Sequence, residues 1–297
     1  MISAPVFCRQ FIGREKEIEL LVKRVRDAAE GTGSVVLVGG EAGIGKTRYV
    51  EEVREHVLRG GGRFTAGECH MHSRSPLGPV VEALRELNAS SHGVLAEIPR
   101  LRFALARLLP ELQPGDAAAQ TGEDRRGQYE AIIEALRHLG ADAPVVVAIE
   151  DAHWADLATL EFLRYAADRV TQAKLVLIVT YRSDELHSRH PLTSTLAKLS
   201  GRACWSITLP PLSDTEMRRL ASDALDGHKE VPVLPLGEIL RLAEGSPLFA
   251  EELLRHTLEP LRQPGADVEL PLSVRALVLE RTTMLQPDDR IHSVTLR

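Results

Sequence analysis

The sequence predicts an α/β fold: a parallel sheet flanked by helices, followed by a smaller all-helical domain. The apolar segment Ser34–Val38 runs directly into the glycine-rich run Gly39–Thr47, and a second apolar segment, Val145–Ile149, ends in two acidic residues. Short buried strands that alternate with helical patterns are typical of parallel sheets. From Leu209 on, the apolar residues follow helical spacing instead of strand patterns. We therefore expect a sheet domain at residues 1–208 and a helical domain at 209–297.

A phosphate-binding loop of the P-loop NTPase kind is predicted at Gly40–Thr47, which fits the pattern G-x-x-x-x-G-K-[ST]. The helix that should follow carries Val50, Val53 and Val57 on one face. Strand, glycine-rich turn and helix N-terminus are the context in which this pattern binds a nucleoside triphosphate. That context disfavours the alternative, a glycine-rich turn that fits by coincidence.

The residue types in this loop suit phosphate chemistry. Glycines adopt backbone angles closed to other residues, so successive N–H groups can face phosphate oxygens, and we expect such angles at Gly40, Gly43 and Gly45. The helix N-terminus adds its positive dipole end. Lys46 is expected to reach the β- and γ-phosphates, and Thr47 to ligate Mg²⁺. The residues expected to line the nucleotide here are Gly40, Glu41, Ala42, Gly43, Ile44, Gly45, Lys46, Thr47 and Arg48.

Two carboxylates follow the strand Val145–Ile149, at the edge where open α/β sheets bind their ligands. We assign Glu150 to the Mg²⁺ shell and Asp151 to the water that attacks the phosphate, which it would orient or deprotonate. A pair of solvated carboxylates is the alternative. Asp156 is expected to cap the next helix instead.

A third apolar strand, Leu175–Thr180, runs into Tyr181 and Arg182. We expect the strand of the glycine loop and the acidic strand to be adjacent, with the end of this third strand also facing the γ-phosphate. Thr180 would then hydrogen-bond the attacking water, and Arg182 would recognise the charge of the γ-phosphate. A strand end followed by a surface arginine is the alternative.

Other elements follow from apolar spacing and capping signals. A further strand is expected at Arg63–Cys69, and a surface loop at Pro114–Asp124. Helices are expected at Ile18–Ala29, Leu77–Leu87, Leu101–Leu109, Ile132–Leu139, after the capping box Ser213–Glu216, at Ile239–Ala243 and Leu248–His256, and near Leu272.

Composition narrows the class of protein. A net charge of −6 without any basic run disfavours direct DNA binding by this chain. The apolar runs are far shorter than the ~20 residues that span a membrane. Met1–Gln10 lacks a signal pattern, which favours a cytoplasmic protein. Cys69-His70-Met71-His72 invites a metal interpretation, but no second ligand cluster has zinc-like spacing.

In their order, these landmarks resemble the STAND branch of the AAA+ superfamily, especially the N-terminal ATPase module of large LuxR-family (MalT-like, LAL) transcriptional regulators. The resemblance runs from about Phe11 to Leu285. Besides the glycine loop, the similar segments are Phe11-Ile12-Gly13-Arg14-Glu15, Ile149–Asp156, Thr180-Tyr181-Arg182 and Gly245-Ser246-Pro247-Leu248. The resemblance implies that Ile12 and Arg14 belong to the adenine site, and that Pro247 packs near the base. Glu150 departs from the family pattern, which often has Asp there.

The resemblance also implies a mechanism, that of a nucleotide-dependent switch with slow, Mg²⁺-dependent ATP hydrolysis. ADP would hold a closed monomer, whereas ATP with an unknown inducer would favour an open state able to self-associate. Arg182 would contact the γ-phosphate. The output domain of such regulators is expected beyond Arg297. Two alternatives stay open: a mechanical AAA+ ATPase such as an origin-recognition-like DNA loader, and the ATPase module of a cyclase or kinase fusion.

Overall fold

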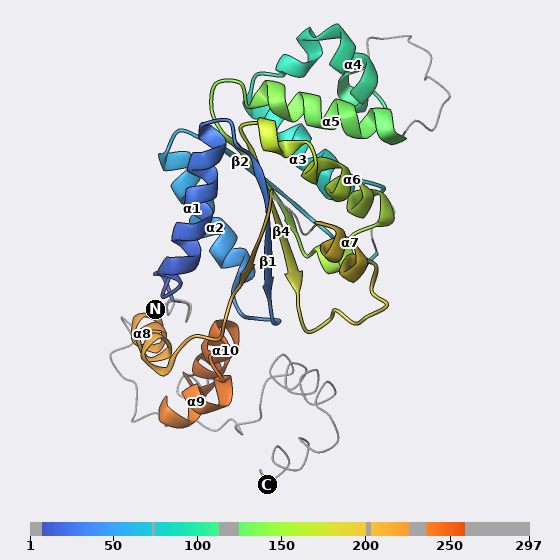
Figure 1. Ribbon diagram of the computed structural model, residues 1–297. Helices are drawn as coiled ribbons and strands as arrows, with labels where there is room; N and C mark the ends of the chain where they lie inside the picture. Colours follow the sequence, from blue (N-terminus) through green and yellow to red (C-terminus); the bar gives the residue numbers. More distant parts are fainter. Residues whose placement is uncertain (1–7, 73–74, 113–124, 200–202, 226–235, 259–297) are drawn as a thin grey trace. The chain divides into compact units, whose positions relative to one another are not determined.

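The computed structural model describes residues 8–72, 75–112, 125–199, 203–225 and 236–258. The chain forms two compact units (Figure 1). Of the described residues, those within Arg14–Ala42 and Lys46–Pro210 belong to the larger unit, and those up to Gly13, within Gly43–Gly45 and from Pro211 on belong to the smaller one. Within the described part of the chain, no helix is both long and apolar enough to span a membrane.

The larger unit is built on a five-stranded sheet in which every pair of neighbouring strands is parallel. The strands are β1 (Ser34–Gly40), β2 (Arg63–Glu68), β3 (Val145–Glu150), β4 (Leu175–Arg182) and β5 (Cys204–Thr208), in the spatial order β2-β3-β4-β1-β5. The predicted parallel sheet is therefore confirmed. The expected adjacency of the glycine-loop strand and the acidic strand is wrong, because β4 lies between β1 and β3. An apolar run identifies a buried strand, but it does not show which other strands lie next to it in the sheet.

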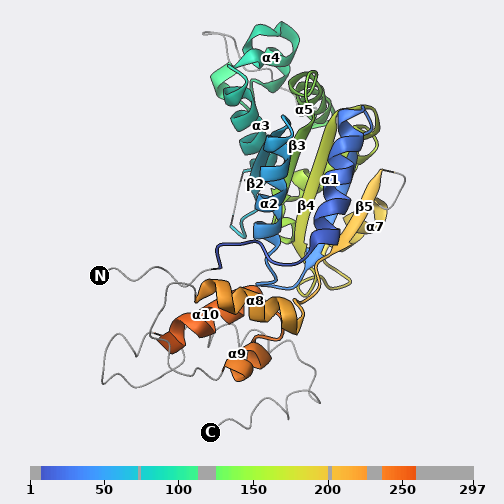
Figure 2. The same ribbon diagram turned by 90° about the vertical axis from the view of Figure 1, so that its left-hand side faces the viewer.

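Helices cover both faces of this sheet (Figures 1 and 2). Helices α1 (Glu15–Ala29) and α2 (Lys46–Arg59) lie on one face, which Figure 2 turns toward the viewer. The other face carries α3 (Gly78–Ser90), α5 (Arg125–Leu139), α6 (Leu157–Ala167) and α7 (Pro191–Leu199), and α4 (Pro99–Leu105) packs on α5. Because both faces are covered, β1 is buried throughout and β4 is buried except for its last two residues, and both strands appear in the sequence as apolar runs.

Asp156 caps α6 as predicted. Its carboxylate accepts hydrogen bonds from the backbone N–H groups of Ala158, at 2.9 Å, and Thr159, at 3.1 Å. These two hydrogen bonds fix the first turn of α6, which begins after the short 3₁₀ helix Ala152–Trp154 that follows β3. The expected loop at Pro114–Asp124 lies outside the described residues.

The described helices of the smaller unit are α8 (Asp214–Ala224), α9 (Leu236–Ala243) and α10 (Pro247–Leu258). The predicted capping box begins α8: the backbone N–H of Ser213 donates to the Glu216 carboxylate at 2.7 Å, and the N–H of Glu216 donates to the Ser213 hydroxyl at 3.4 Å. Met217 and Leu254 lie in the apolar core that joins the three helices, and Ile12 packs into that core. The helix expected near Leu272 lies outside the described residues.

Candidate phosphate-binding site

The glycine loop connects the end of β1 to the start of α2. Gly43 has φ +71° and Gly45 has φ +92°, and L-residues rarely adopt such angles. The prediction of special backbone angles is confirmed at these two positions. It is wrong for Gly40, which is the last residue of β1, has no positive φ, and pairs with Arg182 of β4.

Lys46, the first residue of α2, is buried. Its ammonium group donates hydrogen bonds to the backbone carbonyls of Gly40, at 3.0 Å, and Glu41, at 2.8 Å. Burial lowers the pKa of Lys46, because desolvation disfavours the charged form. Among the described residues, no carboxylate lies within ion-pair distance of this ammonium group. A buried cation bonded to neutral carbonyls at a helix N-terminus is chemically suited to an anionic ligand such as a phosphate.

The hydroxyl of Thr47, in α2, and the carboxylate of Glu150, at the end of β3, lie close together. The Thr47 hydroxyl donates a hydrogen bond to the Glu150 carboxylate at the end of β3. Burial raises the pKa of Glu150, and the nearby carboxylates of Asp151 and Glu68 act in the same direction. A hydroxyl beside a carboxylate crowded by other negative charges is a donor set that fits Mg²⁺.

Asp151 and Thr180 connect the ends of β3 and β4. Asp151 has φ +52°, and its backbone N–H donates to the Thr180 hydroxyl oxygen at 3.0 Å. Thr180 is buried. Since this bond fixes the backbone of Asp151, the carboxylate is held at the carboxyl edge of the sheet. The expected bond from Thr180 to an attacking water stays a prediction.

Arg182 ends β4, directly opposite Gly40 in the register of the sheet. Its guanidinium donates to the carboxylate of Glu185 at 2.7 Å and lies 5.3 Å from the ring centroid of Trp154. Sequence reasoning missed Glu185. An acidic residue three positions after an arginine at a strand end is the signal that could have identified it.

The residues expected near the base belong to both units. Arg14 of the larger unit is buried, with φ +66°, and its guanidinium donates to the Pro210 carbonyl at 3.5 Å. Ile12 and Pro247 belong to the smaller unit, in which Pro247 is the half-buried first residue of α10. In that unit, the Ser246 hydroxyl donates to the Gly43 carbonyl at 3.3 Å.

The other predicted loop residues differ in exposure. Glu41 and Thr47 are exposed, Ala42 and Arg48 are half-buried, and Ile44 is buried. In the described ranges, no group of three or more His, Cys, Asp or Glu residues is arranged to hold a metal ion. Cys69, His70 and His72 therefore do not form such a group.

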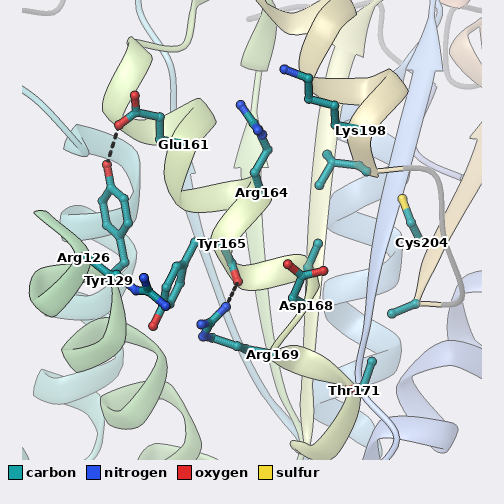
Figure 3. Close-up of a pocket in the computed structure, with 13 residues that line it drawn as sticks. Arg126, Tyr129, Glu161, Arg164, Tyr165, Asp168, Arg169, Thr171, Lys198 and Cys204 are labelled. Carbon is teal, nitrogen blue, oxygen red and sulfur yellow. Dashed lines mark hydrogen bonds between the residues drawn. The ribbon is translucent and has the colours of Figure 1, made fainter.

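A cavity of about 780 Å³, here called the lateral cavity, lies among α5, α6 and α7 (Figure 3). Arg126, Arg164, Asp168 and Lys198 line it, and all four are exposed. Tyr129 donates to the Glu161 carboxylate at 3.1 Å on one side of it (Figure 3). None of the residues predicted to bind or hydrolyse a nucleotide lines this cavity.

Comparisons with known proteins agree with this geometry. Residues 10–179, more than half of the chain, match the family described as the AAA ATPase domain. An uncharacterized protein of Rhizobium meliloti (strain 1021) is 28% identical over 265 residues, which are 82% of this chain and 24% of that protein. The chain thus spans about a quarter of the length of this curated relative.

Among solved structures, the chain is similar to the ORC2 protein of Aeropyrum pernix in ADPNP–ADP complexes, with a TM-score of 0.54 and 15% identity over 98% of this chain and 74% of that one. A second is the Aeropyrum pernix ORC1 protein in complex with DNA, with a TM-score of 0.51, 16% identity, and 94% and 70% of the chains covered. A third is a Signal Transduction ATPase with Numerous Domains (STAND) protein with a tetratricopeptide repeat sensor from Pyrococcus horikoshii, with a TM-score of 0.50, 16% identity, and 97% and 35% covered. At these identities the similarity concerns the fold.

Proposed function

Because this chain belongs to the AAA ATPase domain family, we propose that it binds ATP or ADP with Mg²⁺ and acts as a nucleotide-dependent switch. The output we propose is that of a bacterial LuxR-type transcriptional regulator, controlled by an inducer and by self-association. In this proposal residues 1–208 form the nucleotide-binding domain and residues 209–297 the helical lid.

The chain's own groups supply the binding chemistry. The backbone N–H groups around Gly43 and Gly45 would face phosphate oxygens, and the ammonium of Lys46 would exchange its carbonyl partners for the β- and γ-phosphates. Thr47 and Glu150 would hold Mg²⁺, which when bound offsets the negative charge of the phosphates. The Thr47 hydroxyl lowers the pKa of Glu150 through a side-chain hydrogen bond, against the effect of burial.

One observation carries the switch: Arg182 is bound to Glu185 while it lies beside the start of the glycine loop. A γ-phosphate would compete with Glu185 for the guanidinium, so Arg182 has two alternative anionic partners. A ligand shifts a conformational equilibrium only by its difference in affinity for the two states. ATP and ADP differ in the group that would compete for Arg182, and this supports a switch that distinguishes them.

Hydrolysis is proposed to be slow. Asp151 would accept a proton from the attacking water, with its backbone fixed by Thr180. No arginine finger is evident in the sequence, and such a residue supplies a large part of the rate in fast P-loop enzymes.

The test compares the affinities of wild type and Arg182→Ala for ADP and for a non-hydrolysable ATP analogue, each with Mg²⁺. Losing a hydrogen bond to a charged group costs about 1.5–3 kcal/mol, so affinity for the ATP analogue should fall roughly tenfold or more, with ADP affinity unchanged. Arg164→Ala, in the lateral cavity, is the matched control and should bind both nucleotides normally. Equal losses for both nucleotides would overturn the switch.

Two further measurements would also overturn it. One is a wild-type turnover above the median enzyme rate of ~10 s⁻¹, because a fast cycle belongs to a mechanical ATPase. The other is tight binding of duplex DNA at moderate salt, which would favour an origin-recognition-like loader and is not expected from a net charge of −6.

A further inference from the structure

His153 is a buried imidazole with unsatisfied hydrogen-bonding groups. Its side chain has 0% exposure, and within the described part of the chain neither ring nitrogen has a hydrogen-bond partner. Buried polar side-chain atoms almost always have a partner, and leaving one without costs about 1–3 kcal/mol. A histidine in this state at the carboxyl edge of the sheet therefore calls for a specific explanation.

The two nitrogens face two different carboxylates. Nδ1 lies 3.8 Å from a carboxylate oxygen of Asp151, and Nε2 lies 3.5 Å from one of Glu185. Both separations exceed a normal N–H···O hydrogen bond, so a small movement can close one contact. The ring of Trp154 packs against the imidazole with ring centroids 4.7 Å apart. His153 is thus held between two acceptors.

A neutral imidazole can satisfy only one of them, because it has a single N–H. Burial lowers the pKa of His153, and the nearby charges of Lys46 and Arg182 act in the same direction, while Glu185 and Asp151 act against it. The imidazole is therefore neutral at pH 7, and its two tautomers differ in which nitrogen carries the hydrogen.

Glu185 extends this contact to the sensor arginine. One of its oxygens faces His153, while the other accepts the 2.7 Å hydrogen bond from Arg182. A continuous series of polar groups then runs from Asp151 through His153 and Glu185 to Arg182. Its ends are the proposed acceptor of the water proton and the proposed sensor of the γ-phosphate.

We propose that His153 is a positioning residue which couples Arg182 to the hydrogen-bonding state of Asp151 through the choice of its tautomer. This rests on the proposed function. While Arg182 neutralises Glu185, the imidazole N–H lies on Nδ1 and is directed at Asp151. When Arg182 leaves for a γ-phosphate, Glu185 loses its counter-charge and becomes the better acceptor. The hydrogen is then favoured on Nε2: one proton leaves Nδ1, one is added at Nε2, and the net charge does not change.

The consequence is a link between sensing and hydrolysis. With the hydrogen on Nε2, Asp151 no longer accepts a hydrogen bond from His153 and is free to accept the proton of the attacking water. Asp151 is therefore activated only after Arg182 has found its phosphate partner.

The decisive experiment is performed without nucleotide. Two-bond ¹⁵N–¹H correlation spectra distinguish the two imidazole tautomers, and the signal of His153 among the 11 histidines is assigned from its loss in His153→Phe. Wild type should show the hydrogen on Nδ1, and Arg182→Ala should show it on Nε2. The control Arg164→Ala should resemble wild type. The same tautomer in wild type and Arg182→Ala would overturn the proposal, whether or not the chain proves to be a switch.

Kinetics supply the second readout. His153→Phe should lower kcat for ATP hydrolysis roughly 10- to 100-fold, the range seen when a residue that orients a metal ligand is removed, with KM changed little. Glu185→Gln should lower kcat as well, and adding it to His153→Phe should cause no further loss. A histidine kept only for packing against Trp154 predicts independent, additive effects, and that outcome would also overturn the proposal.

Discussion

Two regions of the larger unit gather charged side chains, and they differ in how those charges are buried. One is the carboxyl edge of the sheet, here called the phosphate edge, with Lys46, Glu150 and His153. Burial lowers the pKa of Lys46 and of His153 and raises the pKa of Glu150, so in all three it favours the neutral form. The other is the lateral cavity, in which Arg164 and Lys198 are exposed at the ends of long side chains (Figure 3).

The difference indicates that buried charges with little compensation are a better guide to the proposed site than the size of a cavity. Exposed charges remain hydrated and cost the fold little, whereas burying a charge without a matched partner costs several kcal/mol. At the phosphate edge, the fold retains such groups close together without full compensation. That arrangement becomes favourable when a ligand supplies the missing charges, and it indicates the site better than the volume of about 780 Å³ does.

Replacing the buried cation should have the largest effect. Lys46→Ala removes the ammonium proposed to bind the β- and γ-phosphates, so nucleotide affinity should fall at least roughly 30-fold, as when one partner of a buried charge pair is removed. Lys198→Ala, in the lateral cavity, should leave affinity unchanged. Mass spectrometry of co-purifying nucleotide measures the same difference: ADP in wild type and Lys198→Ala, none in Lys46→Ala. Nucleotide retained by Lys46→Ala would contradict the claim that the buried Lys46, unlike the exposed Lys198, binds the phosphates.

Glu150→Gln should separate stability from activity. Since burial raises the folded-state pKa of Glu150 above its unfolded value, its contribution to stability is full below the unfolded pKa and is lost as pH rises through the folded pKa. The neutral amide should therefore raise Tm at pH 7, by roughly 2–4 °C for each 1 kcal/mol recovered, and the gain should disappear below about pH 4.5. Mg²⁺-dependent hydrolysis should be lost.

The matched control is Glu161→Gln in the lateral cavity, whose carboxylate accepts from Tyr129. Thermal unfolding between pH 4 and pH 8 measures both variants. A gain in Tm for Glu161→Gln equal to that of Glu150→Gln, or an unchanged Tm for the latter, would contradict the contrast in burial.

The sequence predicts the phosphate edge better than its surroundings. β1, β3 and β4 are buried on both faces, so their apolar runs are unmistakable. β5 was not predicted because it is an edge strand in which only Ile207 is buried. The short helix α7 was missed as well.

Site residues follow the same rule. Motif residues such as Lys46 and Glu150 are identified by local spacing alone. The positions of Arg182 and Glu185 depend on tertiary structure, because the insertion of β4 beside β1 places Arg182 opposite Gly40. Neither the strand order nor the burial of His153 between two carboxylates can be deduced from spacing along the chain.

A smaller effect is expected from Asp156, which caps the helix that carries residues of the lateral cavity. Asp156→Ala removes the acceptor of two backbone N–H groups at the start of α6 and should cost about 1 kcal/mol of unfolding free energy. Asp168→Ala, just beyond the other end of α6, should cost less, because Asp168 is exposed and caps no N-terminus. Chemical denaturation measures both. Equal losses would show that the cap contributes nothing specific.

The smallest effect is expected from the lateral cavity itself, tested by the double variant Arg164→Ala/Lys198→Ala. Both side chains are exposed, and substitutions of such residues usually change stability by no more than about 0.5 kcal/mol each. None of the residues proposed to bind the nucleotide lines this cavity, and moderate salt screens charges in water, so affinity for ATP and ADP should be unchanged. Titration of both nucleotides at two salt concentrations checks this. A change in affinity that disappears at high salt would show that the lateral cavity contributes a field at the phosphate edge, and the two regions could no longer be treated as independent.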